Sequence, residues 1–313
     1  MLNDNSKPLV IFHANCPDGF GAAFAAWLKF GEGAEYLPYD YDGTPAPSVH
    51  GRAVYILDFA FDGPTMERLE SEAHRVVLLD HHQTGIDKLA GFRCICAEQR
   101  LGPNQPRDPH NHSRFSSFWR LDVSKSGARL AWEYFHGQSE VPALIQHVED
   151  RDLHLGQFGD NGRFYLASLD SCPRTFASWK AVLDMEKGED AAEKMARFIG
   201  RGKAMCAYYD QLIDRLVKDA RPLNLLGAKG LLANAARELA DDVGGALATR
   251  SGTFGAVWSV EGQLVKVSLR GAPDFDARAI AEQFGGGGHA QVCAFRLPLG
   301  RLGELLDGSI ETV

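Results

Sequence analysis

The chain has 313 residues, of which 45% are hydrophobic and 24% charged, and these values exclude a disordered chain or a fibre. Lys and Arg total 33 against 41 Asp and Glu, so the net charge of -8 disfavours a protein that coats duplex nucleic acid. At roughly 150 residues per domain, the length predicts two domains.

The lack of a recognisable targeting signal and the spacing of the cysteines predict a cytoplasmic protein. No stretch approaches the roughly 18 uninterrupted apolar residues of a membrane span. The N-terminal sequence MLNDNSKPLVIFH lacks the basic start and long apolar run of a signal peptide. The cysteines form no CxxC pair, which favours a reduced protein over a disulfide scaffold or a zinc finger. They are Cys16, Cys94, Cys96, Cys172, Cys206 and Cys293.

The first half of the chain alternates short apolar runs with helical stretches. Strands are expected at residues 9–12, 36–41, 53–59 and 76–79, and helices at 19–30 and 65–73. This alternation predicts a parallel sheet with right-handed crossovers. Three of the strands end in polar residues, and ligands bind at the carboxyl ends of strands in open parallel sheets. The first half therefore predicts a ligand site at that edge.

Residues 97–123 break this pattern, because they are rich in Pro, Asn, Ser and Arg and show no periodicity. The favoured interpretation is an exposed loop or lid, and the alternative is that His110 and His112 bind a metal ion. Helical patterns resume at 126–135, 141–148 and 190–220. Ser126 has the position and chemistry of an N-cap for the first of these helices.

From residue 223 the pattern becomes that of a smaller α/β unit. Two apolar runs flank the Glu261-Gly262 turn and predict a hairpin, followed by a helix at 275–284 and a strand at 292–297. The predicted fold class is α/β, with a parallel-sheet N-terminal domain and a smaller α/β C-terminal domain. The expected divisions are residues 1–185, a helical linker over 186–222, and residues 223–313.

Side chains suited to metal binding follow several of these elements. Asp80, His81 and His82 leave a buried strand, where such groups are costly without partners. Alone, the triplet is equally compatible with a helix cap beside a surface histidine. Similar groups end other elements: His13, Cys16 and Asp18; Asp58; and Asp150 and Asp152. Mixed Asp and His sites suit Mn²⁺ and Mg²⁺, and two such ions sharing a carboxylate would promote phosphoryl transfer.

Five motifs follow one another along nearly the whole chain: His13-x-x-Cys16-x-Asp18-Gly19, Asp58, Asp80-His81-His82, Asp150 and Gly285-Gly286-Gly287-Gly288-His289. This ordered set resembles the DHH phosphoesterase family with a DHHA1 domain. The length resembles the nano-RNase and pAp-phosphatase branch. The chain is shorter than a RecJ-type exonuclease. The chain also lacks the transmembrane and sensory segments of membrane-bound cyclic-di-AMP hydrolases. Residues 1–185 would then be the DHH domain, and 223–313 the DHHA1 domain.

The resemblance implies a metal centre and a catalytic pair. Its metal ligands would be His13, Cys16, Asp18, Asp58, Asp80, His81 and Asp150. Asp58 would bridge two ions, and Asp80 would ligate an ion or orient the adjacent imidazole. His82 would contact the phosphate and protonate the leaving oxygen, so Asp80 and His82 are the predicted catalytic residues.

Two positions leave alternatives open. Many family members carry Asp-x-Asp in the first motif, where this chain has Cys16-Pro17-Asp18. A thiolate can bind a metal, but the change is equally compatible with a buried cysteine, a different metal preference, or loss of one ion and of activity. Asp152 could replace Asp150 as a ligand, or pair with Arg151.

The glycine-rich run near the C-terminus is the predicted substrate-binding loop. Glycines allow backbone N–H groups to approach an anion, and Arg270 offers a bidentate contact to phosphate. A neutral turn is the alternative. The resemblance implies that the substrate lies in a cleft between the domains, against Arg270, Gly286, Gly287, Gly288 and His289.

The leading hypothesis is a cytoplasmic phosphoric ester hydrolase that uses Mn²⁺, or Mg²⁺, as a pair of ions to activate a hydroxide. Its substrates would be short single-stranded oligonucleotides or small nucleotides, cleaved to mononucleotides. The alternatives are a phosphoanhydride hydrolase for polyphosphate or pyrophosphate, and a degenerate protein that binds nucleotides without cleaving them. Neither a membrane nor duplex nucleic acid is an expected partner. The oligomeric state is open, with a homodimer as one option.

Overall fold

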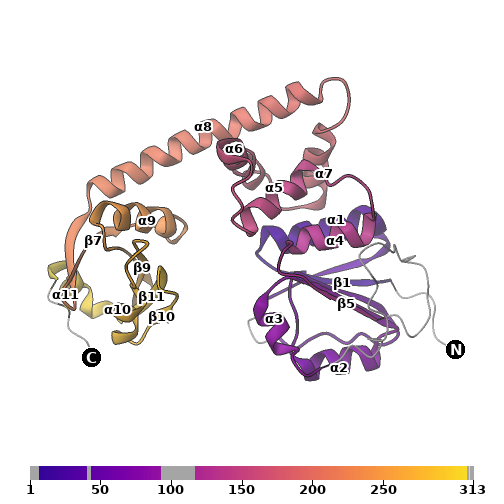
Figure 1. The fold of residues 1–313 in the computed structure, drawn as a ribbon, viewed down its shortest axis with the longest axis horizontal. Coiled ribbons are helices and arrows are strands. Elements are labelled where there is room, and N and C mark those ends of the chain that lie inside the picture. Colours follow the sequence, from indigo (N-terminus) through magenta and orange to yellow (C-terminus); the bar gives the residue numbers. More distant parts are fainter. Residues whose placement is uncertain (1–6, 41–43, 93–116, 309, 311–313) are drawn as a thin grey trace. The chain divides into compact units, whose positions relative to one another are not determined.

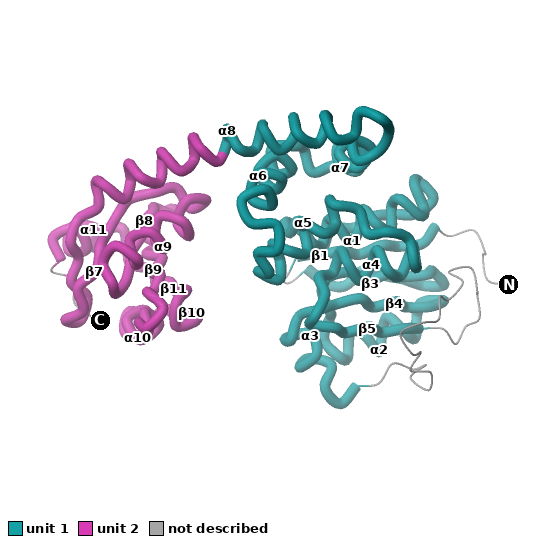
Figure 2. The backbone as a smooth tube through the Cα atoms, turned by 45° about the horizontal axis from the view of Figure 1, so that its top comes forward, with its two compact units in different colours: residues 1–205 teal, residues 206–313 magenta. Residues whose placement is uncertain are grey.

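In a computed structural model, residues 7–40, 44–92, 117–308 and 310 are described. Contacts divide the chain into two compact units, residues 1–205 and 206–313 (Figure 2). Each unit has its own sheet and core, which confirms the predicted α/β fold class. The candidate ligands His110 and His112 lie outside the described residues.

The N-terminal unit is built on a five-stranded parallel sheet in the order β2-β1-β3-β4-β5 (Figure 1). Its strands are β1 (Leu9–His13), β2 (Glu35–Tyr39), β3 (Ala53–Leu57), β4 (Arg75–Asp80) and β5 (Phe118–Leu121). The predicted parallel sheet is confirmed. β5 falls within the segment that the sequence predicted as a loop, because a four-residue strand is too short to show a period.

Helices cover both faces of this sheet (Figure 1). One face packs against α1 (Pro17–Phe30) and α4 (Gly127–His136), and the other against α2 (Gly63–Glu72) and the residue that ends α3 (Gln83–Lys88). Successive side chains of a strand point to opposite faces. Accordingly, Val10 and Phe12 join the first core, and Leu9 and Ile11 join the second. Burial on both faces explains the continuous apolar run of β1.

Three further helices enlarge the first core: α5 (Ala143–Asp152), α6 (Gly159–Asp170) and α7 (Phe176–Met185). The long helix α8 (Ala191–Lys218) has 28 residues and is therefore about 42 Å long. Phe198 in its first part packs in the N-terminal unit, and Ile213 in its last part packs in the C-terminal unit. The division between the units thus falls within α8. The domain limits predicted at 185 and 223 stay predictions.

The C-terminal unit contains a six-stranded mixed sheet in the order β10-β11-β9-β8-β7-β6. Its strands are β6 (Arg221–Leu225), β7 (Ala228–Asn234), β8 (Phe254–Glu261), β9 (Leu264–Gly271), β10 (Gly287–Gly288) and β11 (Val292–Pro298). The hairpin at the Glu261-Gly262 turn is confirmed, with Gly262 at a φ of 62°. One core holds α9 (Ala240–Ser251) and the end of α8, and another holds α10 (Arg278–Gln283) and α11 (Leu302–Asp307).

Membrane-spanning helices and disulfides are both absent from the described residues. None of the helices in the described ranges combines the length and the apolarity that crossing a bilayer requires. The four cysteines in the described part of the chain, Cys16, Cys172, Cys206 and Cys293, are all free thiols.

A buried histidine between α5 and α6 predicts a stability that depends on pH. The His147 ring lies 4.0 Å from the Tyr165 ring and 4.2 Å from the Phe158 ring, and its Nδ1 has no hydrogen-bond partner among the described residues. Burial lowers the pKa of His147 from 6.5 to about 4. As the pH falls from 6.5 towards 4, the unfolded chain gains a proton at this position before the folded chain does. The free energy of unfolding should therefore decrease across this interval, by at most about 3 kcal/mol.

Urea unfolding of the wild type and of His147→Phe between pH 7.5 and 4.5 tests this expectation. The phenyl ring keeps the stacking but does not titrate, so the variant should lose less stability at acidic pH. The exposed His50, replaced in the same way, is the matched control and should change the pH dependence little. The same pH dependence in the wild type and His147→Phe would contradict the prediction.

Candidate metal centre

The polar residues that follow β1, β3 and β4 meet at the carboxyl edge of the parallel sheet. β1 lies between β2 and β3, so the chain passes from β1 to one neighbour and later to the other. A reversal of strand order of this kind is where open α/β sheets bind ligands. His13 ends β1, Asp58 follows β3 and Asp80 ends β4, so the sequence placed them at the correct edge.

Three overlapping groups of side chains each have their ligand atoms within 4.8 Å of one another. They are His13, Cys16 and Asp58; Asp58, His81 and His82; and Asp18, His81 and Asp152. Asp58 and His81 each belong to two groups, so the three form one continuous set, here called the Asp58 cluster. Cys16 lies where a ligand would lie, which favours a metal-binding thiolate over an uninvolved cysteine. Carboxylates and imidazoles with one sulfur fit a divalent transition metal.

Asp58 is the centre of this cluster. It is fully buried and has a φ of 66°, which Asp adopts more readily than most residues. Its carboxylate oxygens lie 3.1 Å from His81 Nε2 and 3.4 Å from His13 Nδ1. Neither oxygen has a hydrogen-bond partner among the described residues. Buried oxygens in this state are costly, and a cation would satisfy them.

The N-terminus of α4 holds a second carboxylate of the cluster. Asp18 Oδ2 accepts a hydrogen bond from the Gly127 N–H at 2.6 Å, and Oδ1 accepts one from the Ala128 N–H at 3.0 Å. Ser126 caps α4 with its hydroxyl, as predicted. A Cβ atom at Gly127 would lie 2.5 Å from Asp58 Oδ1, so only glycine lets the helix approach this closely.

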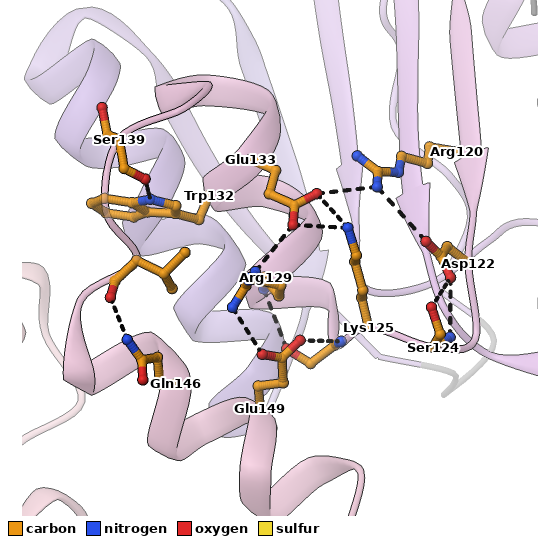
Figure 3. A network of polar contacts seen from close by, with 12 residues as sticks. Arg120, Asp122, Ser124, Lys125, Arg129, Trp132, Glu133, Ser139, Gln146 and Glu149 are labelled. Atoms are coloured by element: carbon orange, nitrogen blue, oxygen red, sulfur yellow. Dashed lines mark hydrogen bonds and ion pairs between the residues drawn. The ribbon is translucent and has the colours of Figure 1, made fainter. Parts of the chain in front are cut away.

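A network of charged side chains fixes the turn that precedes α4 (Figure 3). Glu133 of α4 lies 2.8 Å from Lys125 Nζ and 3.1 Å from Arg129 Nε. It also lies 3.1 Å from Arg120 of β5. Arg129 reaches Glu149 of α5 at 3.2 Å. Several shared ion pairs hold the turn more firmly than one exposed pair, so the N–H groups at the start of α4 stay aimed at the cluster.

Without a cation, the cluster itself holds protons. The close contact with the Asp58 carboxylate raises the pKa of His13 to about 10. Burial raises the pKa of Asp18 well above its ordinary value, and burial also raises the pKa of Asp152. Burial opposes ionisation of Asp58 as well, but His13 and His81 outweigh it and lower its pKa to about 2. A bound divalent cation would replace these protons.

Asp80 orients the adjacent histidines and does not belong to the Asp58 cluster. It is fully buried, and its Oδ1 accepts the His81 N–H at 2.8 Å. The same oxygen lies 2.8 Å from His82 Nδ1, and this hydrogen bond raises the pKa of His82. Of the roles predicted for Asp80, the geometry supports orienting an imidazole. With Nδ1 bound to Asp80, His82 keeps Nε2 for a substrate.

The structure brings Asp152 into the cluster and leaves Asp150 outside it. Asp152 Oδ2 lies 3.4 Å from His81 Nε2. Asp150 Oδ1 instead accepts the Gln157 N–H at 2.7 Å, beyond the end of α5. Two residues apart on a helix, the side chains point about 200° apart, so one element cannot present both to the same ion. The alternative considered for Asp152 therefore has the support of geometry.

The candidate substrate residues of the C-terminal unit gather at one end of its sheet. Arg270 on β9 pairs with Val292 on β11, and the two glycines of β10 also pair with β11. The Arg270 side chain forms an ion pair with Asp241. His289 is exposed, and its N–H donates to the Val292 carbonyl at 2.8 Å.

Close packing or a positive φ explains three of the four consecutive glycines. A Cβ atom at Gly286 would lie 2.2 Å from the Ala294 carbonyl oxygen. Gly285 and Gly288 have positive φ values of 72° and 137°. Gly287 has neither constraint: no described atom lies within 4 Å of a Cβ built there, and its φ is not positive. The described fold does not require glycine at this position.

The fold and the Asp58 cluster define an α/β protein with a candidate divalent-metal centre at the reversal point of a parallel sheet. Residues 227–313 match the family model of the DHHA1 domain. This match covers most of the C-terminal unit and agrees with the resemblance to DHH/DHHA1 proteins that the motifs predicted, and Asp80-His81-His82 stands at the end of β4. The nano-RNase and pAp-phosphatase branch stays a prediction.

Several known proteins are similar to the chain at low identity. The uncharacterized protein R106 of Acanthamoeba polyphaga mimivirus is 23% identical, over 92% of this chain and 67% of its own length. The pGpG-specific phosphodiesterase PggH of Vibrio cholerae is 13% identical with a TM-score of 0.47, covering 97% of both chains. RecJ of Thermus thermophilus, solved with Mn²⁺, is 14% identical with a TM-score of 0.45, covering 98% of this chain and 52% of RecJ.

Proposed function

We propose that the chain is a divalent-metal-dependent phosphoesterase that hydrolyses short oligonucleotides or small nucleotides to mononucleotides. The observation that carries the proposal is the Asp58 cluster, whose buried acceptor atoms call for a cation and whose member His82 is held by a buried carboxylate. The resemblance to DHH/DHHA1 proteins, with the match of residues 227–313 to the DHHA1 domain, supports hydrolysis of phosphoesters or phosphoanhydrides as the class of reaction.

The residues divide into a metal-binding set and a proton donor. His13, Cys16, Asp18, Asp58, His81 and Asp152 would hold the ions. Bound Mn²⁺ or Mg²⁺ would supply a water molecule of lowered pKa and neutralise charge on the phosphate. His82, whose pKa Asp80 raises, is suited to donate a proton to the leaving oxygen.

Product analysis by chromatography tests the proposal. The purified protein is incubated with Mn²⁺ and an RNA dinucleotide, beside Asp80→Asn and the control Asp87→Asn. Asp87 lies on α3, where it accepts a hydrogen bond from exposed Gln83, so its loss removes the same charge away from the cluster. We expect mononucleotides from the wild type and the control, and at least about a 100-fold slower reaction from Asp80→Asn.

Other products would separate the alternatives. Phosphate released from polyphosphate or pyrophosphate, with the dinucleotide intact, would identify a phosphoanhydride hydrolase. Tight nucleotide binding with no product at saturating Mn²⁺ would identify a degenerate binding protein. Equal turnover by the wild type and Asp80→Asn would contradict the proposed role of the Asp80–His82 pair.

Gly287 offers a test of the proposed substrate loop that does not depend on folding. Gly287→Ala should leave thermal stability nearly unchanged, because the methyl group meets open space and the backbone is unstrained. If substrate phosphate approaches the backbone here, the methyl group should raise KM by about tenfold. Thermal unfolding and steady-state kinetics give the two readouts.

Gly286→Ala is the matched control with the opposite expectation. Its methyl group would contact the Ala294 carbonyl oxygen at 2.2 Å, so this variant should be less stable. An unchanged KM in a stable Gly287→Ala protein would remove the loop from the proposed substrate site.

A further inference from the structure

The Asp58 cluster offers two positions for an ion, and their ligand atoms differ in kind. They are the sulfur position, made by His13, Cys16 and Asp58, and the oxygen position, made by Asp18, His81 and Asp152. Each contains a nitrogen and a carboxylate oxygen 3.4 Å apart. Two ligands of one divalent ion lie roughly 3 to 3.5 Å apart, so either position can hold an ion. The sulfur position differs from the oxygen position in having a thiol in place of a carboxylate.

The turn between β1 and α1 fixes the place of Cys16. Asn15, the residue before it, has a φ of 58°, a left-handed conformation that Asn adopts more readily than most residues. Gly19 lets the first turn of α1 approach the end of β1, because a Cβ atom there would lie 2.3 Å from the His13 carbonyl oxygen. The backbone therefore holds the thiol beside the His13 ring and the Asp58 carboxylate.

Helix capping gives no reason for sulfur at this position. Cys16 is the N-cap residue of α1, where a side chain with an oxygen is preferred because it accepts a backbone N–H. The Cys16 side chain makes no such hydrogen bond. The N-terminus of a helix instead favours a negative charge nearby, such as that of a metal-bound thiolate. Metal binding therefore explains a thiol here better than the fold does.

The Asp58 carboxylate shows, independently of the thiol, that the sulfur position is suited to a cation. Asp58 is fully buried, and neither of its oxygens has a hydrogen-bond partner among the described residues. Its Oδ2 lies 3.4 Å from His13 Nδ1 in the sulfur position, and its Oδ1 lies 3.1 Å from His81 Nε2 in the oxygen position. One oxygen faces each position, so the carboxylate can serve two ions at once.

We propose that the two positions select different ions: the sulfur position binds a thiophilic divalent ion of the Zn²⁺ type, and the oxygen position binds Mn²⁺ or Mg²⁺. Thiolates favour softer cations, whereas carboxylates favour harder ones. The inference rests on the proposed function, because it concerns the ions of the same site. It makes Cys16 the residue that determines which ion the sulfur position holds, and it makes a mixed pair of ions the working form of the protein.

Titration with Co²⁺, which replaces Zn²⁺ and absorbs light, tests for a bond to sulfur without turnover. The metal-free wild type should develop a thiolate-to-cobalt charge-transfer band that belongs to one ion per chain, and a second ion should add nothing to it. Cys16→Ser should abolish the band. Cys172→Ser is the matched control and should keep it, because Cys172 is also a half-buried free thiol of the N-terminal unit but belongs to none of the three ligand groups.

Competition between Zn²⁺ and Mn²⁺ measures the selectivity. Dissociation constants of both ions are determined for the wild type and for Cys16→Asp, and elemental analysis counts the bound ions. The wild type should hold one Zn²⁺ and one Mn²⁺ when both are supplied. In Cys16→Asp the preference for Zn²⁺ over Mn²⁺ at the sulfur position should fall at least about tenfold. Asp and Ser are both good N-cap residues, so the metal-free variants should remain folded.

The outcomes separate this inference from the proposed function. A wild type without the charge-transfer band, or a band that survives in Cys16→Ser, would overturn the sulfur position even if the protein cleaves a dinucleotide with Mn²⁺. An unchanged preference for Zn²⁺ in Cys16→Asp would overturn the selection of ions by Cys16. A band and a preference that both depend on Cys16, in a protein that cleaves no substrate, would support the inference and contradict the proposed phosphoesterase.

Discussion

Asp58→Asn should lower the affinity for Mn²⁺ and reduce kcat/KM by about 1000-fold, the largest effect expected from a single change. Asp58 belongs to two of the three ligand groups, so a neutral amide removes negative charge from both sides of the cluster. A 1000-fold loss corresponds to about 4 kcal/mol, which is the scale on which bound metal ions stabilise a phosphoryl-transfer transition state. Calorimetry with Mn²⁺ and steady-state kinetics on a dinucleotide measure the two effects.

The fold should survive this substitution, so the loss can be assigned to the site. Asn tolerates the positive φ of position 58, and it removes a buried carboxylate whose oxygens have no hydrogen-bond partner among the described residues. The metal-free variant should keep the wild-type circular dichroism spectrum, with an unfolding temperature lowered by the loss of the charge contact with His13. Asp62→Asn is the control: Asp62 is exposed and caps α2, a role that Asn also fills. Wild-type Mn²⁺ affinity in Asp58→Asn would show that the cluster is not a metal centre.

The edge of the sheet that carries the site could be predicted from the sequence. Parallel strands have their carboxyl ends on one edge, so any polar residue that follows a buried apolar run must lie there. His13, Asp58 and Asp80 accordingly lie at one edge of the sheet, as predicted.

Contacts between elements distant in the sequence could not be predicted in this way. The backbone N–H groups of Gly127 and Ala128 donate hydrogen bonds to Asp18, which lies more than a hundred residues earlier in the chain. No local sequence pattern predicts such a contact. The Ser126 cap was predicted, because a cap depends on the first turn of one helix. What that helix N-terminus faces depends on the packing of α4 against α1.

The spacing of residues along α5 distinguishes Asp152 from Asp150, whereas the family motif alone does not. Leu144 and Val148 are buried in the first core, and Asp152 continues their spacing of four residues along α5. A spacing of four keeps side chains on one face of a helix, so Asp152 lies on the same face as Leu144 and Val148. Asp150 is also buried, but it lies on another face of α5, against Gly162 of α6.

The second large effect is therefore expected at Asp152. Asp152→Asn should weaken Mn²⁺ binding and lower kcat/KM by about 100-fold, because it removes a carboxylate that lies 3.4 Å from His81 and belongs to the group with Asp18. Asp150→Asn is the matched control, because Asp150 lies two residues away on the same helix and the substitution removes the same charge. Its side-chain oxygen can still accept the Gln157 N–H, so kcat/KM should change less than about threefold.

The pair of variants distinguishes a ligand from a residue that merely shapes the end of α5. A structural role would appear as lower stability in either variant, with Mn²⁺ affinity unchanged. A ligand role predicts the reverse for Asp152→Asn: weaker Mn²⁺ binding, and a smaller rise in unfolding temperature on adding Mn²⁺ than in the wild type. If Asp150→Asn shows these losses and Asp152→Asn does not, α5 must present its other face when the ions are bound. The ligand implied by the family resemblance would then be correct, because metal binding would supply the energy to turn the helix end.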